Sequence, residues 1–256
     1  MESICQRLAL MAAVAGIGMA GVGCTPPVAK EPPAILLFNG TGVSPNDVRA
    51  IETILRKGGH RYATADSARL NGMREEELKA FRLILVPGGN YLKMGASLTP
   101  ETATNLHQAV RSGVHYLGIC AGGLLAGNAT SNSFNLTSGV RVGFYSAVNR
   151  GIHKDAVPIA TAGGGMVDHY WEDGPAFTGW GLAAARYPDG TSAVAEGALG
   201  KGWVVLCGFH PEAPETWRRG MDFKTPASVA NDYARTLIDA ALNGTRLAPV
   251  DAPQGR

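Results

Sequence analysis

The chain has 256 residues, enough for one α/β domain of ordinary size with a buried core and short appendages. Apolar residues make up 45% of it and charged residues 17%, a composition that excludes an intrinsically disordered chain. The formal net charge is only +2, so we expect no nucleic-acid partner.

The first residues have the pattern of an export signal. Arg7 precedes a run of small and apolar residues at 8–20, which is shorter and richer in glycine than the roughly 20 strongly apolar residues of a membrane span. The following Gly21-Val22-Gly23-Cys24 resembles a bacterial lipoprotein box, with Gly21 in place of the usual leucine. This resemblance implies a signal peptide over 1–23 and a lipid on Cys24. We predict an envelope lipoprotein on the periplasmic side, anchored to the membrane through Cys24; plain secretion, an uncleaved anchor and no export are the alternatives.

Residues 24–33 are rich in proline and predict a stiff, extended tether. The expected domain follows over 34–244, and a loose tail over 245–256. With the signal removed and Cys24 lipidated, only Cys120 and Cys207 remain in the domain, which is not a disulfide framework.

Strand and helix patterns alternate along the domain. The apolar run 34–38 predicts a buried strand, and Ser44-Pro45-Asn46-Asp47 predicts the start of a helix that ends at Gly58-Gly59. The later elements predicted are strands at 62–65, 81–86, 115–119 and 203–209, and helices at 99–112 and from 229 to 241. Short segments at 140–144 and 191–195 predict additional strands beside the main sheet.

This alternation predicts an α/β fold, a flavodoxin-like doubly wound, mostly parallel sheet with helices on both faces. In such a sheet, active groups gather beyond the carboxyl ends of the strands. Three candidate segments follow predicted strands in this way: Pro87-Gly88-Gly89, Cys120 and His210.

Cys120 lies where a strand turns sharply into a helix, which projects the sulfur above the sheet and near a helix N terminus, whose partial positive charge favours the thiolate. Gly118 and Gly122 flank it and permit a turn too tight for side chains at those positions. A thiolate attacking an acyl carbon needs donors for the oxyanion, and the backbone amides of Ala121 and of Gly88 or Gly89 are the candidates.

His210 follows the strand at 203–209 and is the candidate general acid and base for Cys120. Glu212 lies two residues further, so in an extended chain its side chain projects to the same side and can orient the imidazole. The sequence therefore predicts a Cys120, His210 and Glu212 triad.

Gly118-Ile119-Cys120-Ala121-Gly122 and Phe209-His210-Pro211-Glu212 resemble the nucleophile and His-Pro-Glu motifs of class I glutamine amidotransferases. Leu85-Val86-Pro87-Gly88-Gly89 and the segment 170–177 resemble the amidotransferase-like domain at the N terminus of some biotin-protein ligases. The resemblance spans roughly 35–242. The related DJ-1 and intracellular-protease branch usually has histidine after its cysteine, where this chain has Ala121, so that branch is disfavoured. We expect a pocket lined by Asn90, Tyr170, Gly174 and Phe177, with an ordinary surface loop as the alternative for 170–177.

The expected function is that of a cysteine hydrolase, cutting an amide or related acyl bond through a thioester. The expected substrate is a small molecule or a peptide. The alternative is a non-catalytic binding or scaffold lipoprotein that retains the triad. No synthase domain is recognised in this chain to receive ammonia.

We expect no cofactor and no metal, because Asp168, His169 and Glu172 match no strong ligand spacing. Cys207 is expected in the core, with a redox link to Cys120 as the alternative. The glycines at 163–165 lack the setting of a nucleotide loop and predict an ordinary one.

Overall fold

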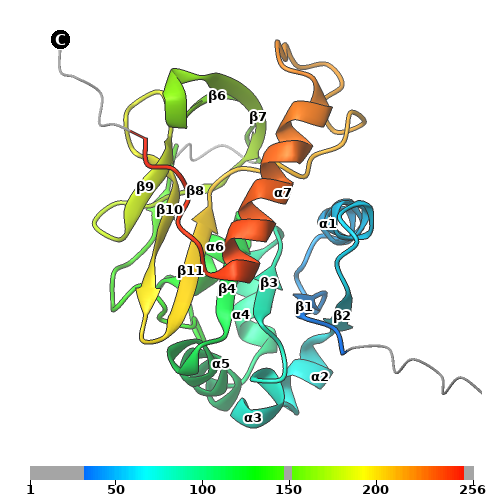
Figure 1. Cartoon of the computed structure of the whole chain (residues 1–256), viewed down its shortest axis with the longest axis vertical. Helices are drawn as coiled ribbons and strands as arrows, with labels where there is room; N and C mark the ends of the chain where they lie inside the picture. Colours follow the sequence, from blue (N-terminus) through cyan, green and yellow to red (C-terminus); the bar gives the residue numbers. More distant parts are fainter. Residues whose placement is uncertain (1–31, 147–151, 251–256) are drawn as a thin grey trace, which may run out of the picture. The chain divides into compact units, whose positions relative to one another are not determined.

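The computed structural model describes residues 32–146 and 152–250, which form one nine-stranded sheet with helices on both faces (Figure 1). The predicted signal peptide, Cys24 and the last six residues lie outside the described residues. None of the helices in the described part of the chain is long and apolar enough to cross a membrane.

One half of the sheet is parallel and holds every strand that the apolar runs predicted. Its order is β2 (Tyr62–Ala65), β1 (Ile35–Phe38), β3 (Leu83–Val86), β4 (His115–Ile119) and β11 (Gly202–Cys207). Apart from the edge strand β2, which is only partly buried, these strands are almost wholly buried because helices cover both of their faces, which explains their continuous apolar sequences. The predicted doubly wound α/β fold is confirmed.

The other half of the sheet is antiparallel. Beyond β11 it continues with β10 (Ser192–Leu199), β9 (Leu182–Arg186), β6 (Lys154–Thr161) and β7 (Met166–Glu172). The predicted strand at 191–195 lies in β10, beside the parallel half. The predicted strand at 140–144 does not join this sheet: β5 (Gly143–Phe144) pairs with β8 (Pro175–Ala176) in a separate small sheet.

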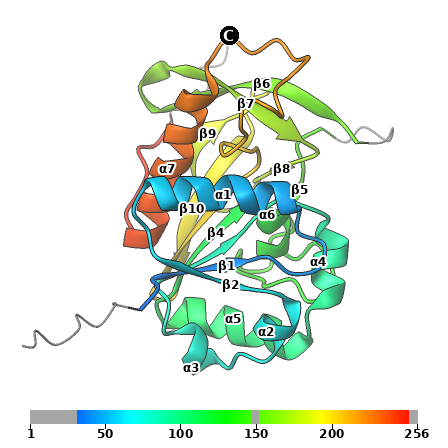
Figure 2. The ribbon, with the colours of Figure 1, turned by 90° about the vertical axis from the view of Figure 1, so that its right-hand side faces the viewer.

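Two helices cover one face of the parallel strands: α1 (Pro45–Lys57) and α7 (Ala227–Asn243) (Figure 2). Their apolar stripes, such as Ile51 and Leu55 on α1 and Leu237 on α7, are buried against the sheet. The opposite face carries α2 (Ser67–Asn71), α3 (Glu75–Leu78), α4 (Tyr91–Ser97), α5 (Pro100–Ser112) and α6 (Ala121–Ala126).

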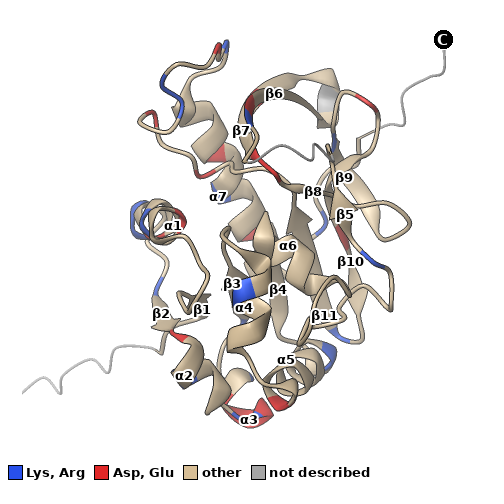
Figure 3. Cartoon of the chain, turned by 180° about the vertical axis from the view of Figure 1, so that it is seen from behind, with Lys and Arg blue, Asp and Glu red and all other residues tan. Residues whose placement is uncertain are grey.

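Local sequence explains where these helices begin and end. The Ser44 side chain accepts a hydrogen bond from the Asp47 amide at the start of α1, and Thr99 caps α5 in the same way. Three glutamates, residues 75–77, occupy the first turn of α3 (Figure 3), where carboxylates favour the helix N terminus.

The segment predicted as a loose tail lies against the sheet over its described part. The Leu247 amide donates to the Glu196 carboxylate at 3.0 Å, and the Val250 amide donates to the Ala183 carbonyl at 3.2 Å. Residues 245–250 therefore help to cover β9 and β10.

Candidate active site

Cys120 occupies a strained turn between β4 and α6. Its φ of 49° and ψ of −108° are rare for a residue with a side chain. The Cys120 amide donates to the Cys207 carbonyl of β11 at 2.8 Å, and the Cys120 carbonyl accepts from the amides of Gly123 and Leu124 as α6 begins. These bonds hold the backbone in a conformation that presents the sulfur beyond the end of the sheet.

Two glycines permit this turn by their lack of a side chain. A Cβ on Gly118 would lie 2.6 Å from the carbonyl of Gly122, and a Cβ on Gly122 would lie 2.0 Å from the Val86 oxygen. The Gly122 amide also donates to the Pro87 carbonyl at 3.1 Å. The end of β3 and the turn at Cys120 are therefore in direct backbone contact.

His210 follows β11, and both its backbone and its side chain make hydrogen-bond contacts that fix its position. Its amide donates to the Tyr170 carbonyl at 2.8 Å, and its Nδ1 lies 3.0 Å from Glu212 Oε1. The Asn231 side chain of α7 donates to the Pro211 carbonyl at 2.9 Å, which fixes the intervening loop. The side chains of His210 and Glu212 are 5% and 0% exposed, so their contact is shielded from water.

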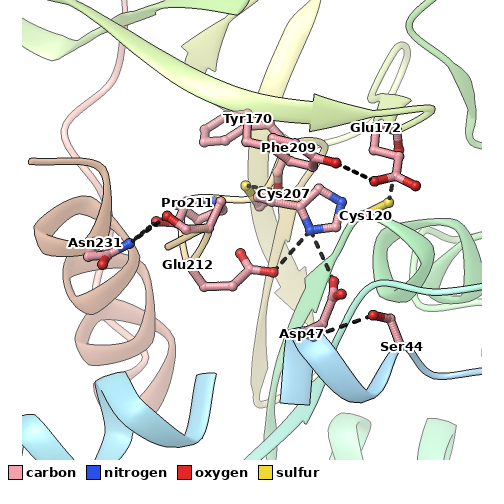
Figure 4. A network of polar contacts seen from close by, with 12 residues as sticks. Ser44, Asp47, Cys120, Tyr170, Glu172, Cys207, Phe209, Pro211, Glu212 and Asn231 are labelled. Atoms are coloured by element: carbon pink, nitrogen blue, oxygen red, sulfur yellow. Dashed lines mark hydrogen bonds and ion pairs between the residues drawn. The ribbon is translucent and has the colours of Figure 1, made fainter. Parts of the chain in front are cut away.

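Asp47, which the sequence analysis did not select, also faces the imidazole. Its Oδ1 lies 3.1 Å from His210 Nδ1, and its side chain is 6% exposed. Figure 4 shows dashed lines from Asp47 and Glu212 that converge on the same ring nitrogen. The available signal was weak: an aspartate in the first turn of α1 is ordinary, and only its burial marks it as unusual.

The charges in this cluster stabilise one another. Burial lowers the pKa of His210, but the charges of Cys120, Glu212 and Asp47 outweigh burial and raise it well above its ordinary value. Burial raises the pKa of Glu212, whereas for Asp47 the effect of burial is exceeded by the charge and hydrogen bonding of His210, so its pKa falls. The geometry thus favours a protonated imidazole, and an imidazolium stabilises a neighbouring thiolate.

Cys120 and His210 line one cavity of about 360 Å³. Among the other predicted site residues, Gly89, Ala121 and Asn90 also line it. Asn90 has a structural task as well, since its side chain accepts a hydrogen bond from the Lys93 amide at the start of α4. The remaining lining residues are Ser44, Asp47, Tyr91, Leu92, Leu124, Phe144, Ile152, Glu172, Asp173 and Trp217.

Gly88 and Tyr170 lie beside His210 without lining that cavity. A Cβ on Gly88 would lie 2.5 Å from His210 Cε1, so glycine leaves the space that the imidazole occupies. The Tyr170 ring centroid lies 5.7 Å from that of His210, and its hydroxyl donates to Glu172 Oε2 at 2.6 Å. The Glu172 carbonyl in turn lies 3.6 Å from the sulfur of Cys120.

Gly174 and Phe177, predicted to line the pocket, pack behind the site instead. A Cβ on Gly174 would lie 1.7 Å from the Gly208 carbonyl oxygen, which shows how closely the two chain segments approach. Phe177 is buried against Gly123 of α6. Phe177 therefore packs against the helix that follows Cys120, Gly174 packs against the segment that precedes His210, and neither lines the cavity.

Cys207 is a free, fully buried thiol whose sulfur lies 3.4 Å from the Phe209 carbonyl oxygen, and burial raises its pKa. It occupies the core, as expected.

Asp168, His169 and Glu172 do not gather around a common point. His169 is buried between the rings of Phe209 and Tyr233, at centroid distances of 4.2 and 5.4 Å, and burial lowers its pKa to about 3. Asp168 instead accepts a hydrogen bond from the Lys224 amide at 2.7 Å. Among the described residues, the side-chain nitrogen and oxygen atoms that do lie close together belong to Asp47, His210 and Glu212, at the Nδ1–oxygen distances given above.

Solved structures show which class of protein has this fold. A glutamine amidotransferase matches with a TM-score of 0.58 at 18% identity, covering 83% of this chain and 100% of the other. A Thermoplasma acidophilum protein assigned to a GMP synthase matches with a TM-score of 0.53 at 11% identity, covering 84% and 96%. The chain therefore has the glutamine amidotransferase-like fold, as its motifs predicted.

The more particular likeness is to the family described as biotin-protein ligase, N terminal, whose model matches residues 33–153. That match supports the predicted superfamily; it includes Cys120 and ends before His210. A GH42 β-galactosidase from G. stearothermophilus also matches, with a TM-score of 0.52 at 11% identity, covering 85% of this chain but only 31% of the longer one. No curated protein matches the chain significantly.

Proposed function

We propose that this protein is a cysteine hydrolase that cleaves an amide or a related acyl bond through a thioester. The observation that carries the proposal is the position of Cys120, in a strained turn and on the same cavity as His210. The imidazole is oriented by buried carboxylates through Nδ1, which leaves Nε2 for proton transfer.

The reaction proceeds in two stages. The Cys120 thiolate attacks the acyl carbon, and the carbon–nitrogen bond breaks as the leaving nitrogen takes a proton from His210 Nε2. A water molecule then gives a proton to His210 and attacks the thioester carbon. The carbon–sulfur bond breaks, the acid departs, and the Cys120 thiolate and the His210 imidazolium of the starting state are restored.

Backbone amides are suited to stabilise the oxyanion of each stage. Ala121 and Gly89 lie on the cavity with Cys120, and a Gly122 contribution is disfavoured because its amide already donates to Pro87. One such donor is typically worth about 2.7 to 4 kcal/mol of the barrier. Ala121 and Gly89 are the preferred pair because they come from two different turns that meet at the nucleophile.

The test combines active-site labelling with turnover. A glutamine-like electrophile, followed by mass spectrometry, is expected to modify Cys120 and to lose most of its rate in His210→Ala. Cys207→Ala is the matched control, because it removes a buried thiol away from the cavity and is expected to leave labelling unchanged. Ammonia release from a panel of primary amides then measures turnover. Equal labelling of Cys120→Ala and the parent protein would refute a nucleophile at this position.

A second candidate is a binding or scaffold role that retains the triad without turnover. The match to about a third of a chain named as a β-galactosidase favours it, because this fold also occurs within a protein named for other chemistry. A cellular phenotype that persists in Cys120→Ala but disappears when Ala121→Phe fills the cavity supports binding. Loss of the phenotype in Cys120→Ala with unchanged folding supports catalysis.

For location, we propose the cell envelope on the periplasmic side, with a lipid on Cys24. The support is the pattern Gly21-Val22-Gly23-Cys24 after the apolar run and before the proline-rich tether. Cys24→Ser is expected to abolish incorporation of labelled fatty acid and to release the protein from the membrane fraction. Retention of the label in that variant would exclude this anchor.

A further inference from the structure

Two carboxyl groups compete for one proton of His210. Nδ1 carries a single hydrogen, yet Glu212 Oε1 and Asp47 Oδ1 lie 3.0 and 3.1 Å from it. Two buried oxygens, Asp47 Oδ1 and Glu212 Oε2, have no hydrogen-bond partner among the described residues. Buried acceptors without a donor are costly, so this arrangement requires an explanation.

Counting charges supplies one. One imidazolium on His210 can neutralise one carboxylate, so two ionised carboxylates would leave a net negative charge beside Nδ1, where the side chains of Asp47 and Glu212 are only 6% and 0% exposed. One ring nitrogen of His210 and one carboxylate oxygen from each of Asp47 and Glu212 all lie within 4.8 Å of one another. Like charges this close and this buried do not both ionise, and one proton remains on the pair.

In the part of the chain that the structure describes, His210 is the positive group that pairs with both carboxylates. From β7 it faces the ring of Tyr170, whose hydroxyl is committed to Glu172, and the Trp217 ring centroid lies 6.0 Å from the imidazole. Lys154 lines a neighbouring cavity with Asp47, but its ammonium pairs with Glu172 at 3.5 Å. Asp47 and Glu212 therefore share one paired cation, the imidazole of His210.

We propose that Asp47 and Glu212 share one proton and together hold one negative charge against His210 Nδ1, which makes Asp47 a second positioning residue. The inference rests on the proposed function, because it concerns how His210 is kept protonated for Cys120. The opposite directions of the two carboxyl pKa values agree with it: burial raises the pKa of Glu212, whereas for Asp47 the charge and hydrogen bonding of His210 exceed the effect of burial and lower the pKa. Removing either carboxyl leaves the other ionised, so the charge survives.

The test is a double-mutant cycle read by labelling. The rate of iodoacetamide modification at Cys120 is measured from about pH 5 to 9 for Asp47→Asn, Glu212→Gln and the double variant. In each single variant the modification rate at Cys120 is expected to fall less than about tenfold at neutral pH, and its dependence on pH is expected to keep the same form. In the double variant the modification rate is expected to fall by far more than the product of the two single-variant factors, and its pH profile is expected to shift. Asp232→Asn, which removes a surface carboxylate paired with Arg235, is the matched control.

Infrared spectroscopy gives an independent measure that does not need the double variant to fold. A protonated carboxyl band is expected at neutral pH in the parent protein and in Asp232→Asn, and is expected to disappear in both single variants. A parent protein without the band, or a single variant that keeps it, overturns the shared proton. In the cycle, losses that multiply independently, or Glu212→Gln alone matching the double variant, also overturn it. A parent Cys120 no faster than a free thiol refutes the proposed function instead, and the infrared result still decides the pair.

Discussion

Replacing Gly122 by alanine adds one methyl group where the turn at Cys120 touches the end of β3. The new Cβ would lie 2.0 Å from the Val86 oxygen and 2.8 Å from its carbonyl carbon, and both are backbone atoms that cannot rotate away. Attractive contact between heavy atoms begins near 3.5 Å, so the two segments must separate by about 1 Å or more. Overpacking of this kind costs about 1 to 3 kcal/mol of stability. A displacement of about 1 Å at a nucleophile can cost about 100-fold in rate.

Gly72→Ala is the matched control for that substitution. Gly72 ends α2 in a right-handed conformation, and its added Cβ would meet nothing closer than 3.6 Å. Urea denaturation should show a loss in Gly122→Ala and a change between zero and a gain of about 1 kcal/mol in Gly72→Ala. The labelling rate of Cys120 should fall only in Gly122→Ala. Parent-like stability and labelling in Gly122→Ala would refute the claim that this contact positions the nucleophile.

Three further outcomes follow from buried groups near the site. Burial lowers the pKa of His169 to about 3, so as the pH falls the unfolded chain takes up this proton before the folded chain does. The free energy of unfolding should therefore fall as the pH drops from about 6.5 towards 3, by up to about 1.4 kcal/mol per pH unit. Urea titrations of His169→Gln should lack this dependence. Asp168→Ala removes the acceptor of the Lys224 amide and should speed limited proteolysis in the segment 214–225, with cleavage at the parent rate contradicting that contact. Tyr170→Phe removes the 2.6 Å hydrogen bond to Glu172. The labelling rate of Cys120 should change by less than about tenfold, because the Tyr170 carbonyl still accepts from the His210 amide. A loss as large as that of His210→Ala would show that the hydroxyl takes part in the chemistry.

The parallel half of the fold was predictable because all of its strands except the edge strand β2 are buried on both faces. Such strands have continuous apolar sequences, as in β3 and β4, and the turns that follow them collect at one edge. Cys120 and His210 could be placed at that edge for this reason. The flanking glycines added a second local signal, since a tight turn leaves no space for side chains.

The antiparallel half was mostly missed because its strands expose one face or an end. β6 alternates buried and exposed residues only in part, and it contains Pro158. In β9 the run is mostly alanine, which has low strand propensity. β9 pairs with β10, and β6 pairs with β7 and β9. The β6–β9 pairing joins segments that are distant in sequence, so no local pattern shows it. The small helices α2, α3 and α4 were missed for a related reason, because four to seven residues show too little periodicity.

Asp47 shows why a site can be half predictable. His210 and Glu212 are neighbours in sequence, so their contact follows from chain geometry. Asp47 lies at the start of α1, after β1, and His210 follows β11, with β3 and β4 between these two strands. Asp47 reaches the imidazole only because α1 starts at the same edge of the sheet. The close approach also depends on Gly88, where a Cβ would lie 2.2 Å from Asp47 Oδ1. The glycine first considered as an oxyanion donor thus gives Asp47 and His210 the space to meet. A substitution at Gly88 would act on proton transfer through the imidazole, and not on oxyanion binding alone.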